Sequence, residues 1–248
     1  MSVVWVQPEE SLPLAQSANE YGLVAAGLDL SPQRLYDAYR EGLFPWYNSG
    51  DPVLWWSTDP RMVLYTHKLH LSRSLQKKIR QIQRAEHTEN AVIQVSCNLA
   101  FRAVIEACAS SRAETGGTWI SEDIINVYHA MHQQGFAHSI ETWVDGELAG
   151  GLYGMNIGGV FFGESMFAYK TDASKISLVY LVDILQRAGL PIIDCQQETA
   201  HLASLGAEPI ARAQFIEQLY LLRDQPQRQW PTGYLRYGQT RLGNATSL

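Results

Sequence analysis

The sequence predicts an α+β fold, because a ladder of antiparallel strands is followed by a helix and then by one more strand. Three strands are expected between residues 138 and 167. Asp145-Gly146 joins the first two, and this dipeptide is a strong signal for a tight hairpin turn. A helix over residues 173–188 and a short buried strand over residues 192–196 follow. This order of elements is typical of the α+β class.

The N-terminal part combines one helix with an aromatic-rich stretch. The first residues are polar and irregular. Ser31-Pro32 predicts the start of a helix that runs to about Gly42, since serine caps helix N-termini and proline suits the first turn. Residues 43–62 are rich in Trp, Pro, Gly and Asp, which predicts ordered loops and short strands held by aromatic packing.

A helix with two distinct faces is expected after Ser72, which can serve as its N-cap. Apolar residues recur at spacings of three and four along one side, and these are Leu71, Leu75, Ile79 and Ile82. A second stripe at the same spacings, called the basic stripe below, consists of Arg73, Lys77, Arg80 and Arg84. Residues 68–84 carry a charge of +6, which leaves −12 for the rest of a chain whose net charge is −6.

The remaining elements are predicted from capping residues and short apolar runs. They are a strand over residues 92–97 and helices over about 98–111, 121–134, 198–205 and 211–223. Asn98 and Ser121 are the expected N-caps of the first two helices. The whole order of elements resembles the acyltransferase fold of the GCN5-related N-acetyltransferases (GNATs), a comparison of folds that does not settle function.

Composition indicates a globular protein of the cytoplasm. The 248 residues are 46% hydrophobic and 18% charged, as is ordinary for a globular protein. No apolar run reaches the roughly 18–20 residues of a membrane-spanning helix, and the first residues lack a basic leader. The cysteines Cys97, Cys108 and Cys195 form no CxxC pair, and their odd number argues against a disulfide framework. We therefore expect a reducing cytoplasmic environment.

The basic stripe and several tryptophans are candidate contacts to nucleic acid. Basic side chains at helical spacing can neutralise phosphates, and aromatic side chains can stack on bases. The tryptophans concerned are Trp46, Trp55, Trp56 and Trp119. The alternatives are a solvated helix face for the charges and a place in the core for the tryptophans. The acidic remainder of the chain gives the binding interpretation more weight, but spacing alone leaves both open.

Two carboxylates and an amide form the candidate chemical site. Asp194-Cys195-Gln196 ends a buried strand, and strict alternation places Asp194 and Gln196 on one face, where both can reach one substrate. Alternatively, Asp194 caps the next helix and Gln196 lies on the surface. Glu164 ends a strand that is apolar on both faces, so it should pair with a positive group, either of a ligand or of the protein itself.

Cys195 and the histidines are weaker candidates. No histidine neighbours Cys195 in the sequence, and alternation turns its thiol into the core, so a packed thiol is expected. His129 and His132 have helical spacing, but only Asp123 lies at a compatible position. We therefore expect an exposed helix face there and no metal site.

A series of short motifs runs through the chain in a fixed order. They are Gly42-Leu43-Phe44-Pro45-Trp46, Leu54-Trp55-Trp56-Ser57, Asp59-Pro60-Arg61, His70-Leu71-Ser72-Arg73-Ser74, Gly117-Thr118-Trp119-Ile120, His138-Ser139-Ile140-Glu141, Gly150-Gly151-Leu152-Tyr153-Gly154, Phe162-Gly163-Glu164-Ser165-Met166-Phe167, Ala173-Ser174-Lys175, Ile193-Asp194-Cys195-Gln196 and His201-Leu202-Ala203-Ser204-Leu205-Gly206-Ala207. The set covers about residues 20–210 and resembles the bacterial leucyl/phenylalanyl-tRNA–protein transferases. Each motif alone is weakly specific, whereas the ordered set is highly specific.

The resemblance implies an activity and an architecture. Members of the family transfer Leu or Phe from aminoacyl-tRNA to the α-amine of proteins that begin with Lys or Arg, which marks those proteins for degradation. The implied partners are therefore aminoacyl-tRNA and such proteins, without a membrane, a metal or another cofactor. The implied architecture is a small N-terminal domain, residues 1–66, followed by a GNAT-like domain, residues 67–248.

The resemblance also implies roles for particular residues. The catalytic and acceptor-binding positions of the family match Asp194, Gln196 and Glu164. Its adenosine-stacking positions match Trp46 and Trp119. The pocket for the transferred side chain corresponds to Leu152, Phe161 and Leu181, and the basic stripe is the expected tRNA contact.

The implied reaction depends on positioning more than on a covalent nucleophile, because the ester of aminoacyl-tRNA is already activated. Holding the amine against the ester carbonyl can contribute roughly 7–11 kcal/mol. An α-amine has a pKa of about 8, and an Asp with a pKa of about 3.9 is a poor base for it. We expect Asp194 to orient Gln196 and to stabilise charge on the amine or pass its proton onward. Glu164 is expected to hold the basic side chain or the N-terminus of the acceptor.

Two other functions are compatible with parts of the pattern. A CoA-dependent N-acyltransferase would need a Gly-rich loop for the pyrophosphate before the helix at 173–188, and residues 168–174 contain no glycine. A non-catalytic module that binds basic N-termini or tRNA would use Glu164 and the basic stripe. In such a module Asp194 and Gln196 would have no common function.

Overall fold

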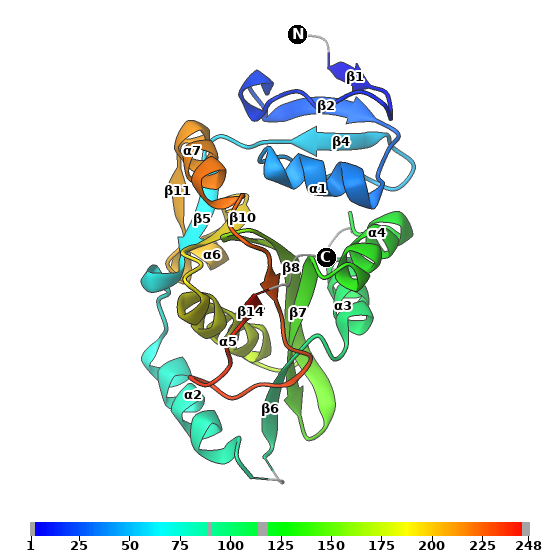
Figure 1. Ribbon diagram of the computed structural model, residues 1–248. Helices are drawn as coiled ribbons and strands as arrows, with labels where there is room; N and C mark the ends of the chain where they lie inside the picture. The colour runs from blue at the N-terminus through cyan, green and yellow to red at the C-terminus, as the bar shows by residue number, and fades with distance from the viewer. Residues whose placement is uncertain (1–2, 89–90, 114–118, 245–248) are drawn as a thin grey trace.

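The computed structural model describes residues 3–88, 91–113 and 119–244, and it confirms the α+β class. A small sheet at the N-terminal end lies against a larger body built around a second, longer sheet (Figure 1). Gly117 and Thr118, which belong to one of the family motifs, lie outside the described residues. Within the described ranges, every helix is too short or too polar to span a membrane.

The small sheet has the strand order β1-β2-β4-β3. Its strands are β1 (Val4–Val6), β2 (Leu23–Gly27), β3 (Phe44–Pro45) and β4 (Val53–Trp56), with the 3₁₀ helix η1 (Ala15–Ser17) between the first two. β1 runs parallel to β2, and the other pairs are antiparallel. The first residues thus form two strands, which their polar and irregular composition did not indicate.

Helix α1 (Pro32–Arg40) lies between the small sheet and the larger body (Figure 1). It begins as predicted, with the Ser31 hydroxyl accepting the Arg34 N–H at 3.2 Å and Pro32 in the first turn. Leu35, Ala38 and Tyr39 are fully buried on one side of α1. The helix packs against α4 (Glu122–Gln133) of the larger body, so this buried side links the two parts of the molecule.

The large sheet, as far as the chain is described, has the strand order β11-β5-β10-β9-β8-β7-β6-β13. β9 and β10 are parallel, and the other neighbours are antiparallel. The strands are β5 (Arg61–Tyr65), β6 (Ile93–Cys97), β7 (Ala137–Val144), β8 (Glu147–Ile157), β9 (Val160–Ala168), β10 (Ile192–Gln196), β11 (Glu208–Ile210) and β13 (Gly233–Tyr234).

Helices cover both faces of the large sheet. Leu152 and Phe161 pack with α2 (Arg73–Ala85) and α5 (Ala173–Ala188) on one face. Tyr153 and Phe162 are the next residues along the same strands, and they pack with α3 (Phe101–Ala113) and α4 on the other face. The short helix α6 (Ala200–Ser204) and α7 (Arg212–Leu222) flank β11 in the sequence.

Local signals predicted several element boundaries correctly. Ser72 and Ser121 cap α2 and α4 through their hydroxyl groups. Asp145 and Gly146 both have positive φ angles, 56° and 81°, as a two-residue hairpin turn requires. Helix α5 and strand β10 have the predicted bounds.

The prediction that Asn98 caps the following helix is wrong, because α3 begins only at Phe101. The Asn98 side chain instead accepts the Ser139 N–H and donates to the carbonyl of Pro231. Short strands near the C-terminus were also not predicted. They are β11, β12 (Arg228–Gln229), β13 and β14 (Gly243–Asn244).

The predicted domain boundary at residue 66 falls inside the 3₁₀ turn η2 (Thr66–Lys68), after β5. Strand β5 pairs with β10 and β11 of the large sheet. We therefore propose a boundary between β4 and β5, so that all strands of the large sheet belong to one domain. This places Arg61, at the first position of β5, in the larger domain.

Candidate active site

The candidate site lies where the two parallel strands β9 and β10 stop pairing. Their pairing ends at Phe162 and Asp194, although β9 continues to Ala168 and β10 to Gln196. Each strand has a bulge just beyond this point. Glu164 has no partner on β8, between the pairs of Gly163 and Ser165, and Cys195 has none on β5, between the pairs of Asp194 and Gln196. Bulges change the direction of side chains and recur next to active sites.

The bulge in β10 changes part of the arrangement that strict alternation predicted. Cys195 and Gln196 both line a cavity of about 730 Å³, whereas Asp194 is fully buried against Arg61. Gln196 therefore reaches the cavity and Asp194 does not, so the expectation that both side chains reach one substrate is wrong. The extra residue of a bulge breaks the two-residue period on which the expectation rested. Cys195 packs with Ile193 against the core and points away from Asp194, as alternation predicted.

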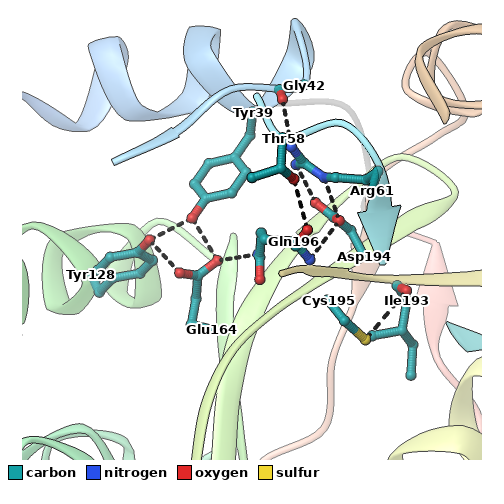
Figure 2. Close-up of polar contacts among 10 residues, drawn as sticks. All are labelled: Tyr39, Gly42, Thr58, Arg61, Tyr128, Glu164, Ile193, Asp194, Cys195 and Gln196. Atoms are coloured by element: carbon teal, nitrogen blue, oxygen red, sulfur yellow. Dashed lines mark hydrogen bonds and ion pairs between the residues drawn. The ribbon is translucent and has the colours of Figure 1, made fainter. Parts of the chain in front are cut away.

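Asp194 forms a fully buried ion pair with Arg61 (Figure 2). The guanidinium Nε and Nη2 atoms donate to the two carboxylate oxygens at 2.8 and 2.6 Å, and both side chains are 0% exposed. Arg61 Nη1 also donates to the carbonyl of Gly42 at 3.2 Å, and its guanidinium lies between the rings of Phe44 and Phe215. This bidentate geometry neutralises the Asp194 carboxylate and fixes its position.

Gln196 is held by main-chain contacts in a left-handed conformation with a φ of 57°. Its N–H donates to Asp194 Oδ1 at 3.0 Å, and its carbonyl accepts the Thr58 hydroxyl at 2.8 Å. A residue other than glycine rarely adopts such a φ unless its surroundings impose it. The Asp194 carboxylate therefore positions the main chain of Gln196. The side chain of Gln196 lines the cavity, and its amide donates to Glu164 Oε1 at 3.2 Å.

Glu164 is held by two tyrosines and by Gln196 (Figure 2). The Tyr39 hydroxyl donates to Oε1 at 2.5 Å, and the Tyr128 hydroxyl donates to Oε2 at 2.9 Å. Burial raises the pKa of Glu164 to about 7, and the negative charge of Asp194 adds to this, while the tyrosine hydrogen bonds and Arg61 act in the opposite direction. Glu164 thus changes its charge near neutral pH.

The expectation that a positive group of the protein pairs with Glu164 is not met among the described residues, where neutral donors hold the carboxylate. Tyr39 and Tyr128 were not predicted as site residues. Both are fully buried on the core-facing sides of α1 and α4, so their sequence pattern predicts core residues. Arg61 was also missed, although an arginine that opens the apolar run Met62-Val63-Leu64 is a signal for a buried ion pair.

The cavity of about 730 Å³ connects three kinds of wall. Trp46, which is 41% exposed, and Trp119 supply aromatic surface. Glu164 and Gln196 supply polar groups. The apolar part includes Leu152, Phe161 and Leu181, the predicted pocket, together with Leu64, Leu178 and Ile193. All predicted catalytic and substrate-contacting residues except Asp194 therefore line one cavity.

The Cys195 thiol lines this cavity but lacks the features of a nucleophile. Burial, together with the charge of Asp194, raises the pKa of the thiol well above its usual range. Its S–H group donates to the Ile193 carbonyl, with a sulfur–oxygen distance of 3.8 Å. A thiol that stays protonated is a weak nucleophile, which agrees with the expectation of a packed, unreactive side chain.

Comparison with known families is consistent with this geometry. The model of the leucyl/phenylalanyl-tRNA protein transferase family matches residues 63–220, and the model of its N-terminal domain matches residues 28–59. The chain belongs to this family. The predicted family and the predicted enzyme class, an aminoacyltransferase, are thereby confirmed.

Relatives in the family match over nearly the whole chain. A leucyl/phenylalanyl-tRNA–protein transferase of Bordetella bronchiseptica is 50% identical over 237 residues, which are 95% of this chain and 93% of that protein. The transferase of Cupriavidus metallidurans is 54% identical over 220 residues, which are 86% of each chain. Among solved structures, a GCN5-related N-acetyltransferase from Kribbella flavida matches with a TM-score of 0.35 and 11% identity, covering 75% of this chain and 64% of that chain.

The basic stripe lies outside the cavity, on helix α2. Its apolar neighbours Leu75, Ile79 and Ile82 are buried, whereas Arg73, Lys77, Arg80 and Arg84 are exposed as the helical spacing predicts. Within the described ranges, none of these four basic residues forms an ion pair with an acid. The stripe is therefore available to a ligand, unlike Lys68 and Lys78, which pair with Glu208 and Asp172.

Proposed function

We propose that this chain transfers Leu or Phe from aminoacyl-tRNA to the N-terminal α-amine of proteins that begin with Lys or Arg, and so marks them for degradation. Family membership supports the reaction type. The observation that carries the assignment to this site is that a single cavity joins aromatic, apolar and polar walls. The 3′ end of an aminoacyl-tRNA presents the three matching groups, which are a base, an amino-acid side chain and the ester between them. Because charged tRNA is the donor, we place the activity in the cytoplasm.

The terminal adenosine of the tRNA would bind between Trp46 and Trp119. Trp56 fixes the position of Trp46. Trp56 Nε1 donates to the Trp46 carbonyl at 2.7 Å, and the two indole rings pack edge to face with their centroids 5.7 Å apart. Stacking of a base on an aromatic side chain contributes about 1–3 kcal/mol. The basic stripe would hold the tRNA backbone, because exposed arginine and lysine side chains bind phosphates without reading sequence.

The transferred side chain would enter the apolar part of the cavity. Leu152, Phe161 and Leu181 are at most 5% exposed and form its wall. An unbranched or γ-branched side chain can extend into such a pocket. A difference of one methylene is worth about 1–3 kcal/mol in a site of this kind, so Met is expected to be accepted alongside Leu and Phe.

The attacking amine would be oriented by Gln196. Among the described residues, no donor forms a hydrogen bond with Gln196 Oε1, so this oxygen is an acceptor for an N–H of the amine. Asp194 acts indirectly, because its carboxylate accepts the Gln196 N–H and so fixes the main chain of Gln196. Arg61 neutralises the charge of Asp194. The expected stabilisation of amine charge by Asp194 is therefore not part of the proposal. Glu164 would contact the acceptor at the polar end of the cavity.

The test is to incubate the protein with leucyl-tRNA and an Arg-initiated peptide and to identify the product by mass. An increase of one Leu residue at the N-terminus supports the proposal. A parallel incubation with acetyl-CoA in place of leucyl-tRNA distinguishes a CoA-dependent acyltransferase. Tight peptide binding without any extended product would instead indicate a non-catalytic binding module.

A further inference from the structure

Glu164, which lines the cavity, and the fully buried Tyr39 and Tyr128 form a closed ring of oxygen contacts, called the Tyr–Glu ring below (Figure 2). Tyr39 contacts one carboxylate oxygen of Glu164, Tyr128 contacts the other, and the two phenol oxygens contact each other. The three residues come from α1, α4 and β9. The ring therefore joins the small N-terminal domain to the large sheet at the bulge that exposes Glu164 to the cavity.

Proton counting distinguishes the two charge states of the Tyr–Glu ring. Each of its three oxygen–oxygen contacts needs one hydrogen to be a hydrogen bond. When Glu164 is ionised, the two phenols supply only two hydrogens, so one contact brings lone pairs together. When Glu164 is protonated, every contact has its hydrogen. The ring can therefore accept one proton and keep all three contacts, although the phenol hydrogen bonds by themselves lower the pKa of Glu164. The Gln196 amide can donate to Glu164 in either state.

The groups around Glu164 allow it to gain and lose this proton while they keep their own protonation states. The titratable or charged groups that face the ring are Tyr39 from α1, Tyr128 from α4, Tyr153 from β8, Arg61 from β5 and Asp194 from β10. Arg61 and Asp194 neutralise each other in their bidentate pair. Burial raises the pKa of both Tyr39 and Tyr128 well above the usual value. The phenols therefore stay protonated while Glu164, with a pKa of about 7, gains and loses its proton.

We propose that the Tyr–Glu ring is the proton acceptor of the transfer reaction, with Glu164 as the catalytic group and Tyr39 and Tyr128 as positioning residues. This inference rests on the aminoacyl transfer proposed above. The amine nitrogen forms a bond to the ester carbonyl carbon, and the proton that the nitrogen loses goes to Glu164. The carbon–oxygen bond to the ribose then breaks, and Glu164 returns the proton to the ribose oxygen, which leaves as a hydroxyl. The ring ends in its original ionised state.

The test compares pH profiles of kcat for Tyr39→Phe, Tyr128→Phe and Glu164→Gln with the wild-type profile. Each phenol stabilises the ionised carboxylate, so its removal should raise the pKa of Glu164 by roughly one unit and move the acid limb of kcat to higher pH. Activity should fall several-fold near neutral pH and recover at alkaline pH, with little change in KM for the tRNA. Glu164→Gln should lower kcat by about 100-fold or more, the usual contribution of acid–base catalysis, at every pH.

Tyr36→Phe is the matched control, because Tyr36 lies on α1 one turn from Tyr39 and outside the ring. Its pH profile should match the wild type, and thermal unfolding of all variants reports whether they fold. The α-amine of the acceptor titrates at a pKa of about 8 and contributes the same limb to every variant. Profiles of both ring variants that coincide with the wild type, or a Glu164→Gln variant with wild-type kcat, would overturn the inference. A wild-type protein that transfers nothing would instead refute the proposed function itself.

Discussion

Replacing Asp194 by alanine is expected to lower both stability and transfer through two separate losses. The first is electrostatic, because Arg61 would remain fully buried without its partner. Removing one member of a buried ion pair typically costs about 3–5 kcal/mol, whereas a whole protein is stable by only about 5–15 kcal/mol. The second loss is positional, because the Gln196 N–H would lose its acceptor at 3.0 Å. A hydrogen bond worth about 1.4 kcal/mol at the transition state corresponds to a tenfold change in rate.

A double variant separates these two losses. Replacing both partners of a buried ion pair by apolar residues is often neutral for stability. The variant Arg61→Met with Asp194→Leu should therefore unfold in urea near the wild-type midpoint, while Asp194→Ala unfolds much earlier. Both variants should transfer at least about tenfold more slowly than the wild type, because neither supplies an acceptor for the Gln196 N–H.

The measurements are urea unfolding curves and steady-state transfer of Leu to an Arg-initiated peptide. Gln196→Ala is the companion variant, since it removes the side chain in the cavity but keeps the ion pair, and it should lose transfer with little loss of stability. A double variant that transfers Leu at the wild-type rate would refute the positioning role of Asp194. A stability of Asp194→Ala within about 1 kcal/mol of the wild type would refute the reasoning from the buried pair.

Three further outcomes are expected. Met should be transferred from its tRNA, whereas Val should be transferred about tenfold less well than Leu because branching at Cβ conflicts with the narrow apolar pocket; equal rates for Val and Leu would contradict this. Changing all four residues of the basic stripe to Gln should raise KM for aminoacyl-tRNA and weaken its salt dependence, while transfer from a short aminoacyl-adenosine donor stays unchanged. Folding raises the pKa of Glu164 to about 7. Between about pH 4.5 and 7 this carboxyl group is therefore protonated in the native state and ionised in the unfolded state. Its contribution to stability falls as pH rises through that window. Glu164→Gln should flatten that fall, by at most about 3 kcal/mol, in urea unfolding at the two ends of the window.

Elements with local signals could be predicted from the sequence alone. Ser31, Ser72 and Ser121 mark helix starts because their hydroxyl groups cap nearby N–H groups, and this chemistry acts within four residues. Strands β1 and β13 have no comparable signal. Each is defined by pairing with a strand distant in the sequence, β2 and β6, and short segments do not encode such partners.

The candidate site was predicted by residue type but not by geometry. Glu164 and Gln196 line the cavity, yet Asp194 does not join them there, because a bulge interrupts the alternation of β10 between Asp194 and Gln196. The bulges depend on how three neighbouring strands fit together, so a strand read by itself does not reveal them. Tyr39 and Tyr128 were missed for a related reason, since only the tertiary fold brings their hydroxyl groups to a carboxylate.

The two bulges also explain how charged groups are tolerated at the centre of the large sheet. Where β9 and β10 separate, the gap opens beside Glu164 and Gln196, and the side-chain bond between these residues bridges it. The buried Asp194 is neutralised by Arg61 from the neighbouring strand β5, and Glu164 is held by phenols from two helices. One of these helices, α1, belongs to the small N-terminal domain. Without that domain Glu164 would lose the hydroxyl of Tyr39, so the small domain is a structural part of the site and not only a cover for it.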